Sequence, residues 1–174
     1  MVGRGIGISD LEKGEANMKI TLSLAGVEDA NAIHAMQIRS FAPLLEKYQD
    51  TGTSPALQSV EHIRERIEQP ATDYYIIRCD AETVGAIRIV RKEQFNRVSP
   101  VFVLPEHQGR GIARATFAVV EARYPDVRRW ELDTVLQEKG NCYLYESLGY
   151  RRYGEEKTIN ERMTLVFYEK EIVR

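Results

Sequence analysis

The stretch VLPEHQGRGIAR, residues 103–114, joins the end of a predicted strand to the start of a predicted helix through two glycines. The apolar run that leads into it is not interrupted by polar residues, which is typical of a strand buried on both faces in the middle of a sheet. Beyond the glycines, apolar side chains recur at helical spacing and predict a helix over 112–124. A helix that starts directly after a strand directs its first unpaired backbone N–H groups, and the positive end of its dipole, at one point. The stretch therefore predicts a site for phosphate.

Gly109 and Gly111 suit such a site because they remove the Cβ atoms that would hold an anion away from the backbone. Arg110 and Arg114 add positive charge, and the Gln108 side chain can fold back to hydrogen-bond within the loop. The dinucleotide fingerprint would need a third glycine where Arg114 stands, and the ATP-binding P-loop would need Gly-Lys-Ser/Thr. A nicotinamide or ATP site is therefore disfavoured. Two alternatives stay open: a tight turn without a ligand, and an unrelated protein that binds a nucleotide phosphate.

The rest of the chain predicts a mixed α/β sheet. Residues 1–17 carry four glycines and no sustained periodicity, so we expect a flexible N-terminal extension before a single domain over 18–174. Pro43 is expected to end or kink the first helix. The predicted strands cover 18–25, 74–80, 84–94, 98–105, 130–136, 150–157 and 162–172, and the predicted helices cover 26–41, 59–70, 112–124 and 140–148.

Composition narrows the partners and the compartment. The chain has 174 residues, of which 43% are hydrophobic, and a formal net charge of -2, so no overall positive field exists to attract nucleic acid or an anionic membrane. Cys79 and Cys142 lack the paired spacing of a zinc site and are too few for a disulfide framework, which favours a reducing cytoplasm and no metal. No run approaches the roughly 20 apolar residues of a membrane span, and residues 1–17 lack a signal peptide's apolar core.

Two motifs resemble those of one family. QGRGIA, Gln108–Ala113, is similar to the Q/R-x-x-G-x-G/A signature of the GNAT superfamily, the acyl-CoA-dependent N-acyltransferases, and it follows a strand as theirs does. NCYLYESLGY, residues 141–150, resembles the second motif of the family, and the element order from Met18 to about Glu171 agrees as well. The resemblance implies a GNAT-like α/β (α+β) fold: a mixed, mostly antiparallel central sheet of about seven strands with a splayed pair, flanked by about four helices.

The resemblance also implies acetyl-CoA as cosubstrate and a set of residues that bind it. The backbone amides of Gly109 to Arg114 would hold the diphosphate, the strand at Val101 to Val103 would hold the pantetheine arm, and the Val101 amide would polarise the thioester carbonyl. The implied cofactor-binding residues are Val101, Phe102, Val103, Gln108, Gly109, Arg110, Gly111, Ile112, Ala113, Arg114 and Asn141.

Tyr145 is the implied catalytic residue, as the group that returns a proton to the departing thiolate. A helix over 140–148 places Asn141 and Tyr145 four residues apart on one face, whereas Tyr143 should point elsewhere. Both residues have structural alternatives: Tyr145 as a half-buried amphipathic side chain, and Asn141 as the N-cap of its helix.

No general base follows from the sequence. Some GNAT enzymes carry a glutamate four residues before the position matched by Val101, and this chain has Arg97 there, which cannot accept a proton. Glu131 and Asp133 can hold a water molecule that accepts the proton of the amine, or they can form a solvated strand face. His107 is explained by packing or capping.

The acceptor region implied by the family covers residues 41–55 and 154–163. Phe41, Tyr48 and Asp50 can line an amine pocket in which the carboxylate favours a cationic acceptor, and Glu155 and Glu156 can contribute from the opposite side. Loop polarity explains the same residues without a function.

The interpretation is an N-acetyltransferase that passes an acetyl group from acetyl-CoA directly to a primary amine of a small molecule or peptide, with a homodimer compatible with the sequence. The alternative is a non-catalytic acyl-CoA-binding sensor module, suggested by Arg97 in the place of the glutamate.

Overall fold

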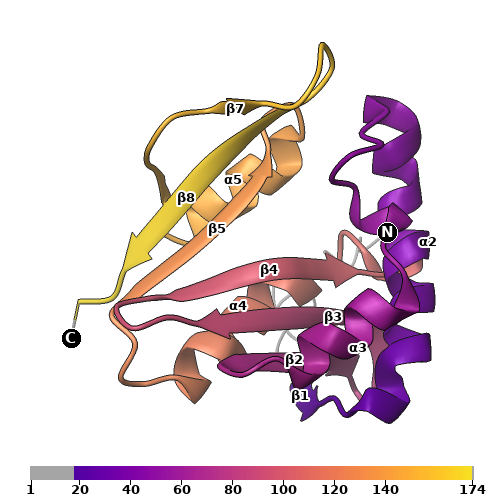
Figure 1. The fold of residues 1–174 in the computed structure, drawn as a ribbon. Helices are drawn as coiled ribbons and strands as arrows, with labels where there is room; N and C mark the ends of the chain where they lie inside the picture. The colour runs from indigo at the N-terminus through magenta and orange to yellow at the C-terminus, as the bar shows by residue number, and fades with distance from the viewer. Residues whose placement is uncertain (1–17, 174) are drawn as a thin grey trace, which may run out of the picture.

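The computed structural model describes residues 18–173, which form one eight-stranded sheet covered by helices on both faces (Figure 1). The predicted extension over 1–17 lies outside the described residues. The strands are β1 (Ile20–Leu24), β2 (Thr72–Cys79), β3 (Glu82–Arg91), β4 (Asn96–Val103), β5 (Arg129–Val135), β6 (Arg151–Arg152), β7 (Lys157–Thr158) and β8 (Thr164–Glu171). The helices are α2 (Ala30–Tyr48), α3 (Val60–Glu68), α4 (Ile112–Arg123) and α5 (Lys139–Ser147), with short 3₁₀ turns η1 (Val27–Asp29), η2 (Pro55–Leu57) and η3 (Pro105–His107).

The strands lie in the order β1-β2-β3-β4-β5-β8-β6, and β7 pairs with β8 beyond this path. Every pairing is antiparallel except that of β4 with β5. Two apolar clusters cover the two faces. Helices α2 and α3 pack on one face through Ile33 and Ile63, and α4 and α5 pack on the other through Phe117 and Tyr145. The predicted fold class is confirmed, with eight strands instead of about seven.

The one parallel pairing is also the shortest contact between neighbouring long strands. Strands β4 and β5 pair only at Asn96 with Trp130 and at Arg97 with Glu131, and then they separate. On its other edge β4 follows β3 as far as Val103, with an irregularity opposite Ile87 to Ile89. The sheet therefore splays from Val98 onward, and the predicted splayed pair is β4 with β5.

Helix α2 is longer than predicted, because it continues through Pro43 to Tyr48. The expectation that Pro43 ends the helix is wrong, since contacts from distant segments hold the last turn. The Tyr48 hydroxyl donates to Glu138, Lys47 Nζ lies 2.9 Å from the same carboxylate, and Asn160 Nδ2 donates to the Tyr48 carbonyl at 2.9 Å. Tertiary contacts thus offset the hydrogen bond that proline removes.

The predicted final strand pair is also present, in a broken form. The stretch 150–157 was expected to be one strand, but only β6 and β7 pair with β8, on either side of a turn at Gly154. Gly154 has a φ of 66°, a backbone conformation that favours glycine and interrupts the ladder.

Gly85 brings β3 close to β4, the strand that lines the site described below. A Cβ atom at this position would lie 2.0 Å from the Phe102 carbonyl oxygen. We expect Gly85→Ala to lower the free energy of unfolding by about 1–3 kcal/mol, because the two strands must move apart. Urea denaturation measures the change. Gly140→Ala is the matched control, since Gly140 lies in α5 with open space around it, and it should stabilise by up to about 1 kcal/mol. Equal stability of Gly85→Ala and the wild type would contradict the close approach.

Candidate active site

The glycine loop between β4 and α4 presents a row of free backbone amides. Gly109 and Gly111 have φ values of 75° and 79°, and a Cβ atom added at either would have nothing within 4 Å. Gly111 is the N-cap of α4, and the first helical bond runs from the Ala115 amide to the Gly111 carbonyl at 3.0 Å. Among residues 18–173, none of the amides from Gly109 to Arg114 has a protein acceptor. We call these six amides the amide cradle; they are suited to an anion.

Side chains around the amide cradle fix its shape. Gln108 Nε2 donates to the Val103 carbonyl at 2.9 Å, so the glutamine folds back onto the strand as the sequence suggested. Arg114 donates to Ser147 Oγ at 2.6 Å and ties α4 to α5. The Arg110 guanidinium contacts His107 Nδ1 at 3.2 Å, and the buried His107 also lies 3.5 Å from Glu82. Packing therefore accounts for His107.

The open edge of β4 leads from the cradle into the splay. The Leu104 amide donates to the Val84 carbonyl at 2.8 Å, which directs it toward β3. Because amides alternate along a strand, those of Val103 and Val101 are turned to the opposite edge, where β5 has separated. This edge can pair with an extended ligand.

A cavity of about 580 Å³ runs along the amide cradle and the open edge of β4; we call it the cradle cavity. It is bounded by α2, β4, α4 and α5, elements that are distant in sequence. The site residues expected from the sequence that line it are Val101, Phe102, Val103, Gln108, Gly109, Gly111, Ile112, Ala113, Arg114, Asn141 and Tyr145. Arg110 is the exception, because its exposed side chain turns to His107.

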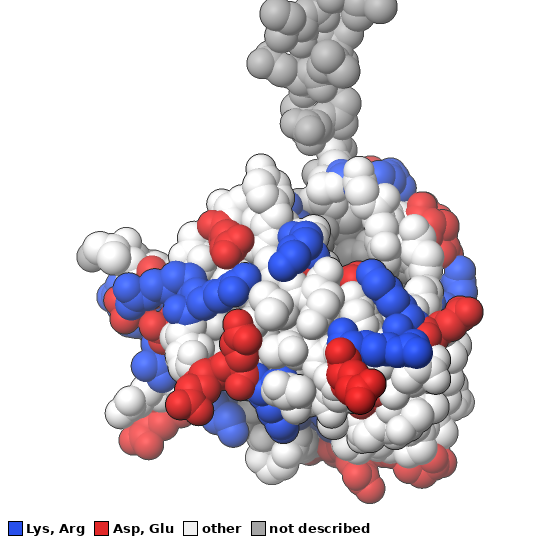
Figure 2. Space-filling view, turned by 90° about the horizontal axis from the view of Figure 1, so that it is seen from above, with Lys and Arg blue, Asp and Glu red and all other residues white. Residues whose placement is uncertain are grey.

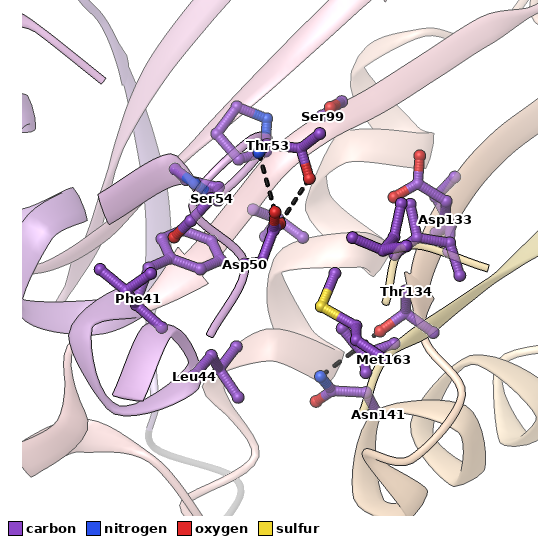
Figure 3. Close-up of a pocket in the computed structure, with 18 of the residues that line it drawn as sticks. Phe41, Leu44, Asp50, Thr53, Ser54, Ser99, Asp133, Thr134, Asn141 and Met163 are labelled. Carbon is purple, nitrogen blue, oxygen red and sulfur yellow. Dashed lines mark hydrogen bonds between the residues drawn. The ribbon is translucent and has the colours of Figure 1, made fainter. Parts of the chain in front are cut away.

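A second cavity, of about 350 Å³, lies on the other side of the splay and is shown in Figure 3; we call it the Ser99 cavity. Its walls come from α2, the loop after it, α3, β4, β5 and the segment around β7. Both cavities are lined by Phe41, Leu44, Val101, Asn141 and Tyr145. Two ligands that enter from opposite sides would therefore meet at these residues.

Tyr145 lies at this junction with its ring in the core. It is 7% exposed and makes edge contacts with Phe117 and Tyr150 at centroid distances of 5.6 and 6.0 Å. No hydrogen-bond partner for its hydroxyl exists among the described side chains and backbone groups. Burial, and then the nearby Asp133 carboxylate, raise the pKa of Tyr145 above its usual value, so the phenol stays protonated at neutral pH. Tyr145 therefore packs in the core and also lines both cavities with a protonated hydroxyl. Tyr143 is 72% exposed and points away, as expected.

Asn141 does not cap its helix. The N-cap of α5 is Glu138, and Asn141 lies in the first turn with its side chain reaching toward Thr134 Oγ1 at 3.5 Å (Figure 3). The capping alternative is therefore wrong, because α5 begins two residues before Asn141. Its amide is left at the junction of the two cavities.

The two carboxylates of β5 are both engaged. Asp133 lines the Ser99 cavity and forms an ion pair with Arg97. Glu131 is 8% exposed, accepts from the Tyr153 hydroxyl at 2.9 Å and lies 3.0 Å from Arg129. A solvated strand face is therefore wrong for Glu131, which is buried and contacts Tyr153 and Arg129. Only Asp133 is in a position to contact a ligand or its water.

The expected acceptor residues divide into two groups. Phe41 and Asp50 line the Ser99 cavity, whereas Tyr48 turns to Glu138 and Glu155 and Glu156 lie outside both cavities. Asp50 is 4% exposed, and its carboxylate accepts hydrogen bonds from the turn in which it lies (Figure 3). It accepts from the Gly52 amide at 3.2 Å, the Thr53 amide at 2.9 Å and the Thr53 hydroxyl.

The residues of the Ser99 cavity that were not predicted from the sequence include Arg66, Ser99 and Gln58. A signal for Arg66 existed: it is three residues after the fully buried Ile63 and so shares its helix face. Nothing local indicated Ser99 or Gln58, since the packing of α3 against the sheet brings them together.

Over residues 18–173 no helix is long and apolar enough to cross a membrane, and no group of three or more metal-ligating acidic, histidine or cysteine side chains is found. Figure 2 shows acidic and basic side chains interleaved on one face of the molecule.

The sequence and the fold are similar to those of known acetyltransferases. The sequence model of the family described as "Acetyltransferase (GNAT) domain" matches residues 44–172. An uncharacterized Bacillus subtilis (strain 168) protein, YrkN, is 29% identical over 130 residues, which are 73% of this chain and 70% of YrkN. An acetyltransferase from Thermus thermophilus superposes with a TM-score of 0.69 at 18% identity, over 88% of this chain and 97% of that one.

A spermidine N-acetyltransferase from Vibrio cholerae, solved in complex with CoA and spermine, superposes with a TM-score of 0.67 at 18% identity, over 87% of this chain and 95% of that one. At such identities the solved structures show the shared fold, and the family match over well more than half of the sequence shows the family. The chain belongs to the GNAT acetyltransferases and is an acyltransferase.

Proposed function

We propose that the protein transfers an acetyl group from acetyl-CoA directly to a primary amine of a small molecule or peptide. The observation that carries the proposal is the meeting of the cradle cavity and the Ser99 cavity at Val101, Asn141 and Tyr145. One cavity offers donors for a diphosphate and an extended arm, and the other can hold an acceptor. Membership of an acetyltransferase family favours an enzyme over a non-catalytic acyl-CoA-binding sensor.

The residues present fit coenzyme A. The amide cradle is free of protein acceptors, and the glycines at 109 and 111 leave the space in front of it open, so the diphosphate would be held there. The amides of Val101 and Val103 at the splayed edge of β4 would bind the pantetheine arm. Acetyl-CoA supplies the acetyl group as a thioester. The Vibrio cholerae relative contains CoA, which supports the same ligand here.

Two groups of the chain act on the reacting atoms. The Val101 amide would donate to the thioester carbonyl and stabilise the charge that develops on its oxygen, and one such donor contributes about 2.7–4 kcal/mol to the transition state. Tyr145 would donate the proton that the departing thiolate needs, and its raised pKa keeps that proton in place.

We assign no side chain as general base. Asp50 is held by its turn and Asp133 by Arg97, so the amine proton would leave through water in the open cavity. We therefore expect kcat/KM to rise with pH as more of the acceptor amine becomes neutral.

The buried free cysteines, Cys79 and Cys142, support a cytoplasmic site of action.

Thiol release from acetyl-CoA tests the function across polyamines, aminoglycosides, amino acids and peptide N-termini. We expect turnover with at least one class and an amide product of matching mass. Calorimetry with coenzyme A and with ATP tests the cosubstrate separately. Tighter binding of ATP would overturn the assignment and favour a nucleotide-phosphate protein.

A further inference from the structure

Arg66 presents an unpaired positive charge to the Ser99 cavity. It is half-buried on α3 and lines the cavity together with Ser99 and Pro100. Among the described residues, no carboxylate lies within ion-pair distance of its guanidinium. Burial lowers the pKa of Arg66 because the charged form loses hydration. A partly desolvated guanidinium without a counter-ion is costly to the protein unless a ligand supplies one.

A second guanidinium lies behind the part of the cavity lining that Arg66, Ser99 and Pro100 form, which we call the Ser99 wall. Arg88 of β3 is 8% exposed, and it donates to the Ser99 carbonyl at 2.8 Å and to Gln69 Oε1 at 2.9 Å. Its Nε is buried and has no acceptor among the described groups. Burial, followed by repulsion from Arg66 and Arg97, lowers the pKa of Arg88 to about 10. The two acceptors of Arg88 are uncharged carbonyl oxygens, so no negative charge balances its guanidinium.

The acidic residues of the cavity do not balance this charge. Asp133 is paired with Arg97, and the Asp50 carboxylate accepts three hydrogen bonds from its own turn. Lys157 adds an exposed positive charge on the side of β7. Arg66 and Arg97 both lie close enough to Arg88 to lower its pKa, and of these three guanidinium groups only that of Arg97 has a carboxylate partner, Asp133.

We propose that the Ser99 wall of this cavity, with Arg66 as its contact residue, binds an anionic group of the acceptor, so that the acceptor is a primary amine that also carries a carboxylate or a phosphate. The inference rests on the proposed acetyl transfer and names its substrate class. The sequence had suggested a cationic acceptor that binds to Asp50. The proposal replaces it with an acceptor that carries an anionic group, because the Asp50 carboxylate already accepts hydrogen bonds from its own turn. Arg66 offers the planar pair of donors that carboxylates and phosphates accept. Arg88 is a positioning residue: it donates to the Ser99 carbonyl, and its positive charge adds to the electrostatic attraction for an anion at this wall.

The test compares matched acceptors that differ in one acidic group. One arm pairs amino acids and dipeptides with their C-terminal amides, and the other pairs phosphoethanolamine with ethanolamine, so the arms distinguish carboxylate from phosphate. For the wild type we expect higher kcat/KM for the acidic member of at least one pair. In Arg66→Gln this preference should fall about 10- to 100-fold, through KM, as for loss of a hydrogen bond to a charged group. Arg66→Lys should keep part of it.

Arg64→Gln is the control, because Arg64 lies exposed on the same helix beside Glu61 and should leave the preference unchanged. Thermal melting checks that each variant folds. Wild-type preference for neutral or cationic members, unaffected by Arg66→Gln, would overturn the anion subsite and leave the acetyltransferase proposal intact. Absence of turnover with every acceptor would count against the proposed function instead. Calorimetry of the CoA complex with N-acetylated amino acids and their amides then decides the subsite, since equal binding of each pair would overturn it.

Discussion

Gly111→Glu is expected to abolish coenzyme A binding. Glutamate at this position puts a side chain and a negative charge in front of the amide cradle, where Gly111 leaves open space. The dipole and free amides at the start of α4 would then be used by the chain's own carboxylate. Isothermal calorimetry should detect no binding at ligand concentrations about 100-fold above the wild-type Kd, a loss of more than about 2.7 kcal/mol.

Backbone strain requires a control, because φ at Gly111 is 79° and side chains rarely adopt this conformation. Gly154→Glu makes the same change at another open glycine with a positive φ of 66°, in the turn between β6 and β7. It should bind coenzyme A as the wild type does. Gly111→Ala adds the strain without the charge and should retain weaker binding. A folded Gly111→Glu protein with wild-type affinity would show that the diphosphate binds elsewhere.

Tyr145→Phe is expected to lower kcat by about 10²–10⁴-fold, the usual contribution of a positioned proton donor. The ring and its edge contacts with Phe117 and Tyr150 stay, and the hydroxyl has no partner among the described residues, so stability should change little. KM for acetyl-CoA should stay near the wild-type value, because the cradle and the β4 edge are untouched. Steady-state kinetics with thermal melting measures both effects.

Tyr143→Phe removes a hydroxyl from the same helix at a side chain that is 72% exposed, and it should keep full activity. Turnover of Tyr145→Phe equal to the wild type would make Tyr145 a packing residue only. A second outcome against the assignment is a loss confined to KM, since a proton donor acts after the substrates are bound.

Local sequence was sufficient where the chain's own backbone makes the feature. Gly109 and Gly111 leave the space in front of the amide cradle open, and they adopt positive φ values that glycine adopts readily. The same holds for the Gln108 contact with Val103, which spans five residues. These features depend on few neighbours, so their residue types and spacing were enough to predict them.

The acceptor side could not be predicted because distant segments build it. Tyr48 turns to Glu138 across 90 residues, and Arg97 takes up Asp133 across 36. An interpretation of Tyr48 and Asp133 as unengaged side chains therefore does not hold, because the hydroxyl is already hydrogen-bonded and the carboxylate is already paired. Arg66 shows the reverse: its spacing from Ile63 places it on the inner face of α3, but only the packing of α3 brings it beside Ser99 without a carboxylate partner.

The short seam between β4 and β5 affects the order in which the molecule is assembled. Residues 20–103 contain the four strands on one side of the seam, and residues 129–171 contain those on the other, so the strands of each half can pair with one another before the halves join. Val101 comes from the first half and Tyr145 from the second, and both cavities need both. Neither cavity exists until the halves dock. A ligand that occupies them recognises only the docked chain, and its concentration therefore adds to the stability of the completed fold by mass action.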